Sequence, residues 1–236
     1  MVSKRVEQLF TKHFSEIFDK EIDLTSQREH SSQFSFQNFT ILEHFEYNSQ
    51  LIIDKNTTSK LEIKENAGII ATIVIEKDTE FDLHFYAHSN SCILLKCIIK
   101  EGATCNILGN YLAQKDKNWI FIELLHEGEK SASDLKVLGY SSNNAQCIND
   151  GLVQIGRNAQ NSSGYQTMTN YVLSNTSKVF SEPKLEIFNP NVMCSHGSTI
   201  SPIEKETLYY LESRGISQKQ SIQLLEESMY DTFMNS

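Results

Sequence analysis

Hydrophobic and polar positions follow one pattern through the middle of the chain and another near its ends. Between Phe34 and about Phe188, short runs rich in β-branched and aromatic residues recur about every 10 residues, separated by polar connections. No helical period stands between the runs, so the pattern predicts an all-β body. The runs are FSFQNFTIL, LIID, LEIKE, IIATIVIE, FDLHFYAH, CILLKCIIK, CNILGNYLA, WIFIELLH, LKVLGY, GLVQIG, YVLS and LEIF.

The connections between these runs favour stacked rungs over hairpins. They are short and polar, as in Asp54–Thr57, Glu101–Thr104 and Ser141–Asn144. The whole chain has only 10 glycines and 3 prolines, whereas tight hairpins depend on such residues. The pattern therefore slightly favours a solenoid of stacked rungs, with a sandwich and a cupin-like jelly roll left as alternatives.

Helical spacing of apolar residues appears on both sides of this body. Residues 4–20 predict one short amphipathic helix, since Val6, Leu9, Phe10 and Phe14 recur at helical intervals. We expect a short N-terminal helical segment over residues 1–24, a β core over 25–198 and a C-terminal helical segment over 199–236.

The C-terminal segment carries start and stop signals for two helices. Ser201–Glu204 has the sequence of a capping box, with Pro202 at the first helical position. Gly215 is expected to end this helix, and Ser217 with Gln220 to begin the next one. The apolar stripes of the two helices suit either a cap on the β body or a surface for a partner.

Charge and hydropathy exclude several classes of protein. A net charge of −9 without a basic stripe argues against nucleic-acid binding, which needs clustered lysine and arginine. The longest apolar stretch, near Ala71–Ile75, is far shorter than the roughly 20 residues that span a bilayer. The N-terminal residues lack an apolar signal-peptide core, so we expect a cytoplasmic protein without a membrane partner.

The chain has five cysteines, and none of them forms a CxxC pair. Four of them, Cys92, Cys97, Cys105 and Cys147, are expected to be buried, reduced thiols that pack as small hydrophobic groups. Nothing in their spacing indicates a disulfide framework.

Cys194 and His196 form the candidate metal site. They are two residues apart in a segment that reads as extended, so their side chains share one face at roughly 6–7 Å along the strand. A thiolate and an imidazole suit zinc, iron or an iron–sulfur cluster. Such centres need three or four ligands, so the missing ones must come from another polypeptide or from distant residues.

Three motifs near the C-terminus resemble a known family. PxLEI begins at Pro183, CSHG at Cys194 and LxYLxSRGI at Leu208, in the order found in the SufB/SufD family of iron–sulfur cluster assembly scaffolds, and in its SufD branch in particular. The resemblance implies a right-handed parallel β-helix and a scaffold without catalytic residues. It also implies that His196 first, and Cys194 second, help to build the cluster at an interface with a SufB-type subunit.

The resemblance also implies partners. Besides a SufB-type β-helical chain, it implies a SufC-type ABC ATPase docked on the C-terminal helices, with self-pairing as the alternative for the isolated chain. No cofactor is expected on the isolated chain, and a transient iron–sulfur cluster is expected only at the shared interface. We expect the ATPase contact on six apolar side chains: Leu208, Tyr209, Leu211, Ile222, Leu225 and Met229.

The sequence departs from the SufB pattern at two places. The SufB branch has a glutamate directly after the histidine and a cysteine on an upstream rung, whereas this chain has Gly197 and, near that rung, Gln166 and Thr167. The long N-terminal helical region of the family is expected to be reduced to the helix over residues 4–20. The chain thus resembles a short SufD-type subunit.

Two enzymatic or metal-binding alternatives fit less well. A β-helical polysaccharide-active enzyme needs paired carboxylates along its groove, and no repeated pair stands on one face. A cupin-like metal site needs an HxH pair, which the chain lacks; His84 and His88 are four residues apart, too far to chelate one ion. Neither GxxxxGK[ST] nor GxGxxG occurs, so a partner must bind any ATP that the process uses.

Overall fold

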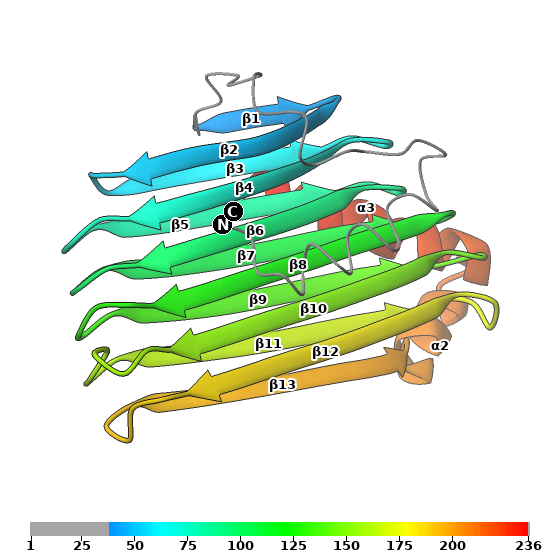
Figure 1. Cartoon of the computed structure of the whole chain (residues 1–236). Helices are drawn as coiled ribbons and strands as arrows, with labels where there is room; N and C mark the ends of the chain where they lie inside the picture. Colours follow the sequence, from blue (N-terminus) through cyan, green and yellow to red (C-terminus); the bar gives the residue numbers. More distant parts are fainter. Residues whose placement is uncertain (1–37, 236) are drawn as a thin grey trace.

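Two parallel β-sheets lie face to face in the computed structural model, which describes residues 38–235 (Figure 1). From β1 to β13 the chain passes from one sheet to the other after each strand, so successive strands form the turns of a β-solenoid. The odd-numbered strands form the first sheet: β1 (Phe39–Leu42), β3 (Thr57–Ile63), β5 (Glu80–Ala87), β7 (Thr104–Ala113), β9 (Ala132–Ser141), β11 (Ser163–Val172) and β13 (Met193–Pro202). The even-numbered strands form the second: β2 (Phe45–Ile53), β4 (Gly68–Ile75), β6 (Cys92–Ile99), β8 (Lys117–His126), β10 (Gln146–Ile155) and β12 (Lys178–Ile187).

This architecture confirms the prediction of a mainly β solenoid. Each of the apolar runs overlaps a strand, although YVLS overlaps only the last two residues of β11. The sandwich and jelly-roll alternatives are wrong because every strand pair is parallel, which a chain of hairpins cannot produce.

The connections between the strands of the solenoid share one backbone conformation. Each of the eight connections from β3 to β11 contains one residue with a left-handed backbone, which turns the chain sharply from one sheet to the other. Asparagine, aspartate and glycine hold most of these positions, as the polar connections predicted. The residues are Asn66, Asp78, Asn90, Gly102, Asp116, Lys130, Asn143 and Asn161.

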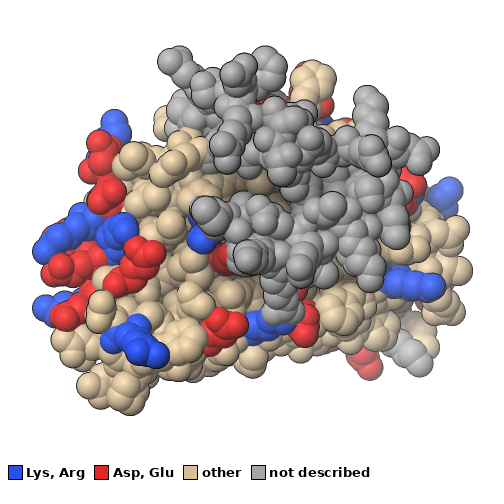
Figure 2. All heavy atoms as spheres, in the orientation of Figure 1, with Lys and Arg blue, Asp and Glu red and all other residues tan. Residues whose placement is uncertain are grey.

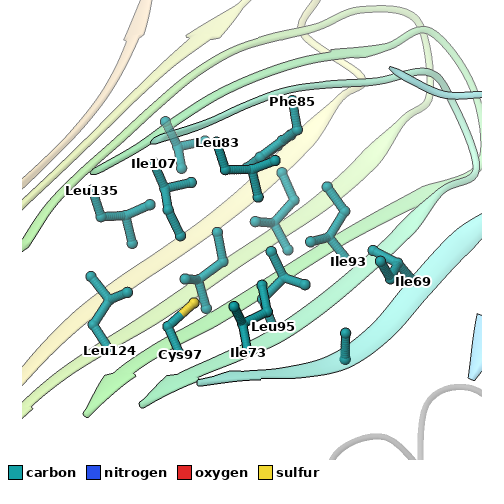
Figure 3. Close-up of a cluster of buried hydrophobic side chains, with 14 of the residues drawn as sticks. Ile69, Ile73, Leu83, Phe85, Ile93, Leu95, Cys97, Ile107, Leu124 and Leu135 are labelled. Carbon is teal, nitrogen blue, oxygen red and sulfur yellow. The ribbon is translucent and has the colours of Figure 1, made fainter. Parts of the chain in front are cut away.

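The core fills the space between the two sheets. Side chains from β4, β6 and β8 meet those from β5, β7 and β9 across this lumen, as Figure 3 shows for Ile73, Leu83, Leu95 and Ile107. Burial of these aliphatic side chains stabilises each rung by roughly 1.5–3 kcal/mol per residue. The apolar N-terminal and middle rungs thereby give a rigid base to the rungs that follow.

Two helices follow the last strand. The first, α2 (Lys205–Ser213), is followed by Arg214 and Gly215, and the φ of 84° at Gly215 permits the C-terminal stop that the sequence predicted. The second, α3 (Gln218–Asn235), begins at Ser217, which exchanges hydrogen bonds with Gln220 as in the predicted capping box.

The prediction of a capping box at Ser201–Glu204 is wrong. Pro202 is the last residue of β13, opposite Val172 of β11, and α2 begins at Lys205 without a side-chain cap. Ser201 and Pro202, which the local motif assigned to the start of a helix, are instead paired with β11 as the end of β13. The helix predicted over residues 4–20, like the N-terminal segment over 1–24, lies outside the described residues.

Helix α3 packs on the outer face of the odd-numbered sheet. Phe233 and Met229 are buried against Tyr86 of β5, and Lys60 of β3 donates hydrogen bonds to the carbonyls of Phe233 and Met234 at the helix end. A lysine at this position also suits the negative end of the helix dipole. The C-terminal half of α3 is thus part of the folded body.

Charged side chains are paired across neighbouring turns. Lys77 lies 3.0 Å from Glu101 and Lys100 lies 2.7 Å from Glu127. Figure 2 shows basic and acidic side chains interleaved on the face that it presents, without a continuous basic stripe among the described residues. No helix among residues 38–235 is both long enough and apolar enough to cross a membrane.

Candidate metal centre at the open end of the solenoid

Strand β13 carries the predicted metal ligands on its inner face. Cys194 lies opposite Gly164 of β11, and His196 lies opposite Gln166. Gly164 and Gln166 are buried inside the lumen, and residues in register on parallel strands point to the same side. Both candidate ligands therefore share one face of the strand, as their spacing predicted, and that face is the lumen side of the last rung.

Cys194 is half-buried over the lumen. This partial burial raises the pKa of its thiol, while a hydrogen bond with the backbone of Gly164 acts in the opposite direction. The thiol is thus protonated near neutral pH in the isolated chain, and metal binding must displace its proton.

The side chain of His196 is exposed at the rim of the lumen. Within residues 38–235, its ring makes no hydrogen bond. The next residue, Gly197, points to the opposite, outer face of β13, and no atom lies within 4 Å of the position that its Cβ would take. The exposed ring of His196 itself is open to a partner chain or a ligand at the rim.

The two candidate ligands do not make a complete metal site by themselves. In the described part of the chain, no group of three or more histidine, cysteine, aspartate or glutamate side chains is placed to hold a metal ion. The other four cysteines are buried and reduced, as predicted. Burial raises the pKa of Cys147 to about 11, so this thiol stays protonated as well.

The lumen below these two candidate ligands is polar, which the sequence reasoning missed. Tyr111 donates a 2.8 Å hydrogen bond to Asn170, which also accepts a hydrogen bond from Asn149 and donates one to the carbonyl of Thr199 on β13. A tyrosine of β7 and two amide side chains, on β10 and β11, are thus linked to the last strand. Their signal in the sequence is the alternation of polar residues in β10 and β11, where other strands have aliphatic ones.

A second polar group lies directly under the two candidate ligands. Ser198 of β13 donates a 2.8 Å hydrogen bond to Ser181 of β12, which lies across the lumen. Ser181 in turn contacts the sulfur of Met168 at 3.4 Å, and Gln166 contacts the same sulfur at 3.9 Å. The side-chain oxygens of Gln166 and Asn149 are buried without a hydrogen-bond partner.

The other histidines considered for metal binding have structural partners. His126 is buried deeper in the lumen, with both ring nitrogens 2.8 Å from hydroxyl oxygens of Ser131 and Ser133. His88 lies 2.8 Å from the carboxylate of Glu62 on the outer face of the odd-numbered sheet. His84 lies opposite Lys60 of β3 and Leu108 of β7, and no cluster of metal-ligating side chains in the described part of the chain includes it.

The six side chains predicted to contact the ATPase fall into three groups. Tyr209 is 65% exposed, and Leu208, Leu211, Ile222 and Leu225 are half-buried. Met229 is only 4% exposed because it packs against the sheet. Leu208, Tyr209 and Ile222 line a cleft of about 480 Å³ between the helices and the ends of β11 and β13.

The chain is similar to proteins of a known family over much of this region. The family model described as "SUF system FeS cluster assembly, SufBD core domain" matches residues 99–229, a span that contains the polar lumen, the two candidate ligands and most of both helices. The iron–sulfur cluster assembly protein SufD of Escherichia coli is 33% identical over 84 residues, which are 36% of this chain and 20% of that protein.

Two further relatives are proteins of the iron–sulfur cluster assembly SufBD family. One, from Synechocystis, is 38% identical over 81 residues, 34% of this chain and 18% of its own length. Another, from Staphylococcus epidermidis, is 27% identical over 144 residues, 61% of this chain and 30% of its own. The chain thus spans less than a third of the length of these relatives. Because the family model covers more than half of the chain, the protein belongs to the SufBD core family of the SUF iron–sulfur cluster assembly system.

Proposed function

We propose that this chain is a SufD-type scaffold subunit, which builds or transfers iron–sulfur clusters together with a SufB-type subunit and a SufC-type ATPase. The observation that carries the proposal is the uncovered inner face of β13, where Cys194 and His196 lie above a polar lumen. Sulfur and nitrogen ligands suit iron, and two of them leave the remaining positions to a partner. The similarity to a SufD protein over 84 residues supports the same assignment.

The open end offers a surface on which a SufB-type chain can pair. Strands β12 and β13 are the outermost strands of their sheets, so one edge of each has backbone groups without a strand partner among the described residues. Such edges accept a further strand from another chain. Ile187 and Ile200, at the ends of these two strands, are 45% and 48% exposed and supply apolar area beside the polar lumen.

The ATPase contact is proposed for α2 and the start of α3. The cleft lined by Leu208, Tyr209 and Ile222 gives a concave apolar surface, which suits an inserted side chain or helix. Met229 cannot take part while α3 is packed on the sheet, so the proposed surface consists of the other five side chains. In this arrangement the chain provides ligands and geometry, and the ATPase provides energy.

The site is tested by anaerobic cluster reconstitution with co-expressed SufB-type and SufC-type partners. His196→Ala should reduce bound iron and sulfide at least several-fold, while the thermal midpoint and complex formation stay unchanged, because the ring is exposed and makes no contact that stabilises the fold. His44→Ala is the matched control, since it removes another exposed imidazole far from β13. Full cluster assembly by His196→Ala would show that the site assignment is wrong.

A further inference from the structure

Gln166 of β11 is a buried amide whose oxygen has no partner. Its side chain is 1% exposed, and its oxygen Oε1 makes no hydrogen bond. The amide nitrogen has only the thioether sulfur of Met168, at 3.9 Å, which is a weak acceptor. A buried acceptor without a donor is unfavourable, so its presence calls for a donor that the isolated solenoid does not provide.

The amide lies in the centre of the lumen, one rung inside its open end. Gly151 of β10 leaves the space for it, because Nε2 of Gln166 lies 1.7 Å from where a Cβ at Gly151 would be. On the side of the opening, Gln166 is in register with His196, at the usual strand separation of about 4.8 Å. His196 is thus the histidine in register with Gln166 on the side of the open end.

A neutral imidazole has one N–H and one free lone pair, and it binds metal through the lone pair. Histidines that bind metals usually donate the other ring N–H to a neighbouring acceptor, which fixes the tautomer and the orientation of the ring. We propose that Gln166 is a positioning residue for His196: its Oε1 accepts one ring N–H, and the other ring nitrogen is thereby directed out of the lumen toward the incoming iron. This inference rests on the proposed function of His196.

The competing explanation is an ordered water molecule bound to Oε1, which buried polar cavities commonly hold. In that case Gln166 would serve the fold alone, and the state of the His196 ring would not depend on it. The two explanations therefore differ in a property of His196 that can be observed without any cluster.

The tautomer of His196 provides the first test. The full chain, labelled with ¹⁵N-histidine, is studied by NMR at about pH 8, where an ordinary imidazole is neutral. The ring of His196 should show one predominant tautomer in the wild type and in Gln166→Glu, which keeps an acceptor oxygen, but a mixture of both in Gln166→Met. An unchanged tautomer in Gln166→Met would overturn the proposal, provided that its thermal midpoint shows a folded chain.

Cluster assembly with the partners provides the second test. Gln166→Met should lower the rate of cluster formation several-fold, and Gln166→Glu should restore part of it. In a His196→Ala background, Gln166→Met should cause no further loss, because the amide acts through the ring. A further loss there would overturn the proposal. Gln146→Met is the matched control, since this glutamine at the start of β10 is exposed and faces away from the lumen.

The two tests separate this inference from the proposed function. If His196→Ala leaves assembly intact, the function assigned to the histidine is wrong, and the tautomer experiment still decides whether Gln166 holds the ring. If His196→Ala abolishes assembly but both tautomers persist equally in wild type and Gln166→Met, the function stands and the role of Gln166 is refuted.

Discussion

Buried polar side chains at the C-terminal end of the lumen satisfy one another only in part. Asn170 uses its amide oxygen for Tyr111 and Asn149 and its amide nitrogen for the carbonyl of Thr199. The side-chain oxygens of Asn149 and Gln166 are buried and accept no hydrogen bond. Each unmade hydrogen bond costs about 1–3 kcal/mol. Unpaired acceptors at this end of the lumen are what a binding surface requires, because a bound group can supply the missing donors.

His126 gives the stability of the fold a pH dependence. Burial lowers its pKa to about 4, whereas an unfolded histidine titrates near 6.5, so the unfolded chain binds more protons between these values. This contribution, about 3 kcal/mol, is complete above roughly pH 6.5 and is lost as the pH falls toward 4. Urea unfolding of wild type and His126→Gln at several pH values should show a smaller acid loss in the variant. Equal losses would mean that the buried ring is not the group responsible.

Two glycines of the odd-numbered sheet differ in what surrounds them. A Cβ at Gly139 would lie 1.8 Å from the ring of Tyr111, whereas a Cβ at Gly197 meets no atom within 4 Å. Gly139→Ala should therefore destabilise the fold by about 1–3 kcal/mol, and Gly197→Ala should change it by less than about 0.5 kcal/mol. Denaturant titration of the two variants makes the comparison. Equal effects would mean that the lumen around Tyr111 adapts to the added methyl group.

At the scale of elements, sequence pattern predicted a strand wherever the lumen is apolar. Runs such as IIATIVIE and CILLKCIIK became β4 and β6 because burial against the opposite sheet rewards aliphatic residues. In β11 the inward positions hold Gln166 and Asn170 and several outward ones are exposed, so only its last residues stood out. Hydrophobicity cannot mark a strand whose buried face is polar.

Only one feature of the candidate site, the shared face of its two side chains, could be predicted from the sequence. The shared face of Cys194 and His196 follows from the two-residue period of any strand. The position of Gln166 beneath His196 depends on the register between β11 and β13, which is fixed by the turn and by β12 between them. The spacing of residues within one segment does not reveal how that segment pairs with a distant strand. The start of α2 was misplaced for the same reason, because the pairing of β13 with β11 extends to Pro202.

The proposed contact with the ATPase is tested on the surface of α2. Tyr209→Asp places a charge on an exposed side chain beside the cleft, where burial of an unpaired carboxylate is unfavourable. The variant should lose the ATPase in pull-down experiments and keep its thermal midpoint. Leu224→Asp is the control, since Leu224 is 45% exposed on α3 but lies outside the proposed surface. Retention of the ATPase by Tyr209→Asp would remove α2 from the interface.

Across the whole molecule, burial decreases toward the C-terminal rungs. Strand β6 is buried over most of its length, whereas β13 has no fully buried residue. Neighbouring rungs supply most of the stability of a solenoid, so its last rung opens most easily. The unpaired end is therefore both the proposed binding surface and the least stable part of the β body.

Amide hydrogen exchange should reveal this gradient. In the chain alone, the amides of β12 and β13 should exchange faster than those of β6 to β8, because a strand beyond them is missing. Addition of a SufB-type partner should slow exchange in β12 and β13 and leave β3 and β5 unchanged. Protection at the β1 end instead would place the partner on the opposite end of the solenoid.

The polar side chains inside the last rungs also affect how readily the open end associates with other apolar surfaces. A solenoid whose terminal cavity were lined with leucine and isoleucine would attract any other exposed apolar edge, including the end of its own copies, and would tend to grow into fibres. Amides, hydroxyls and an imidazole form directional bonds, so a mismatched end leaves buried groups unbonded and is rejected. The same side chains that give the end its chemistry thus favour a complementary neighbour over a second copy stacked end to end.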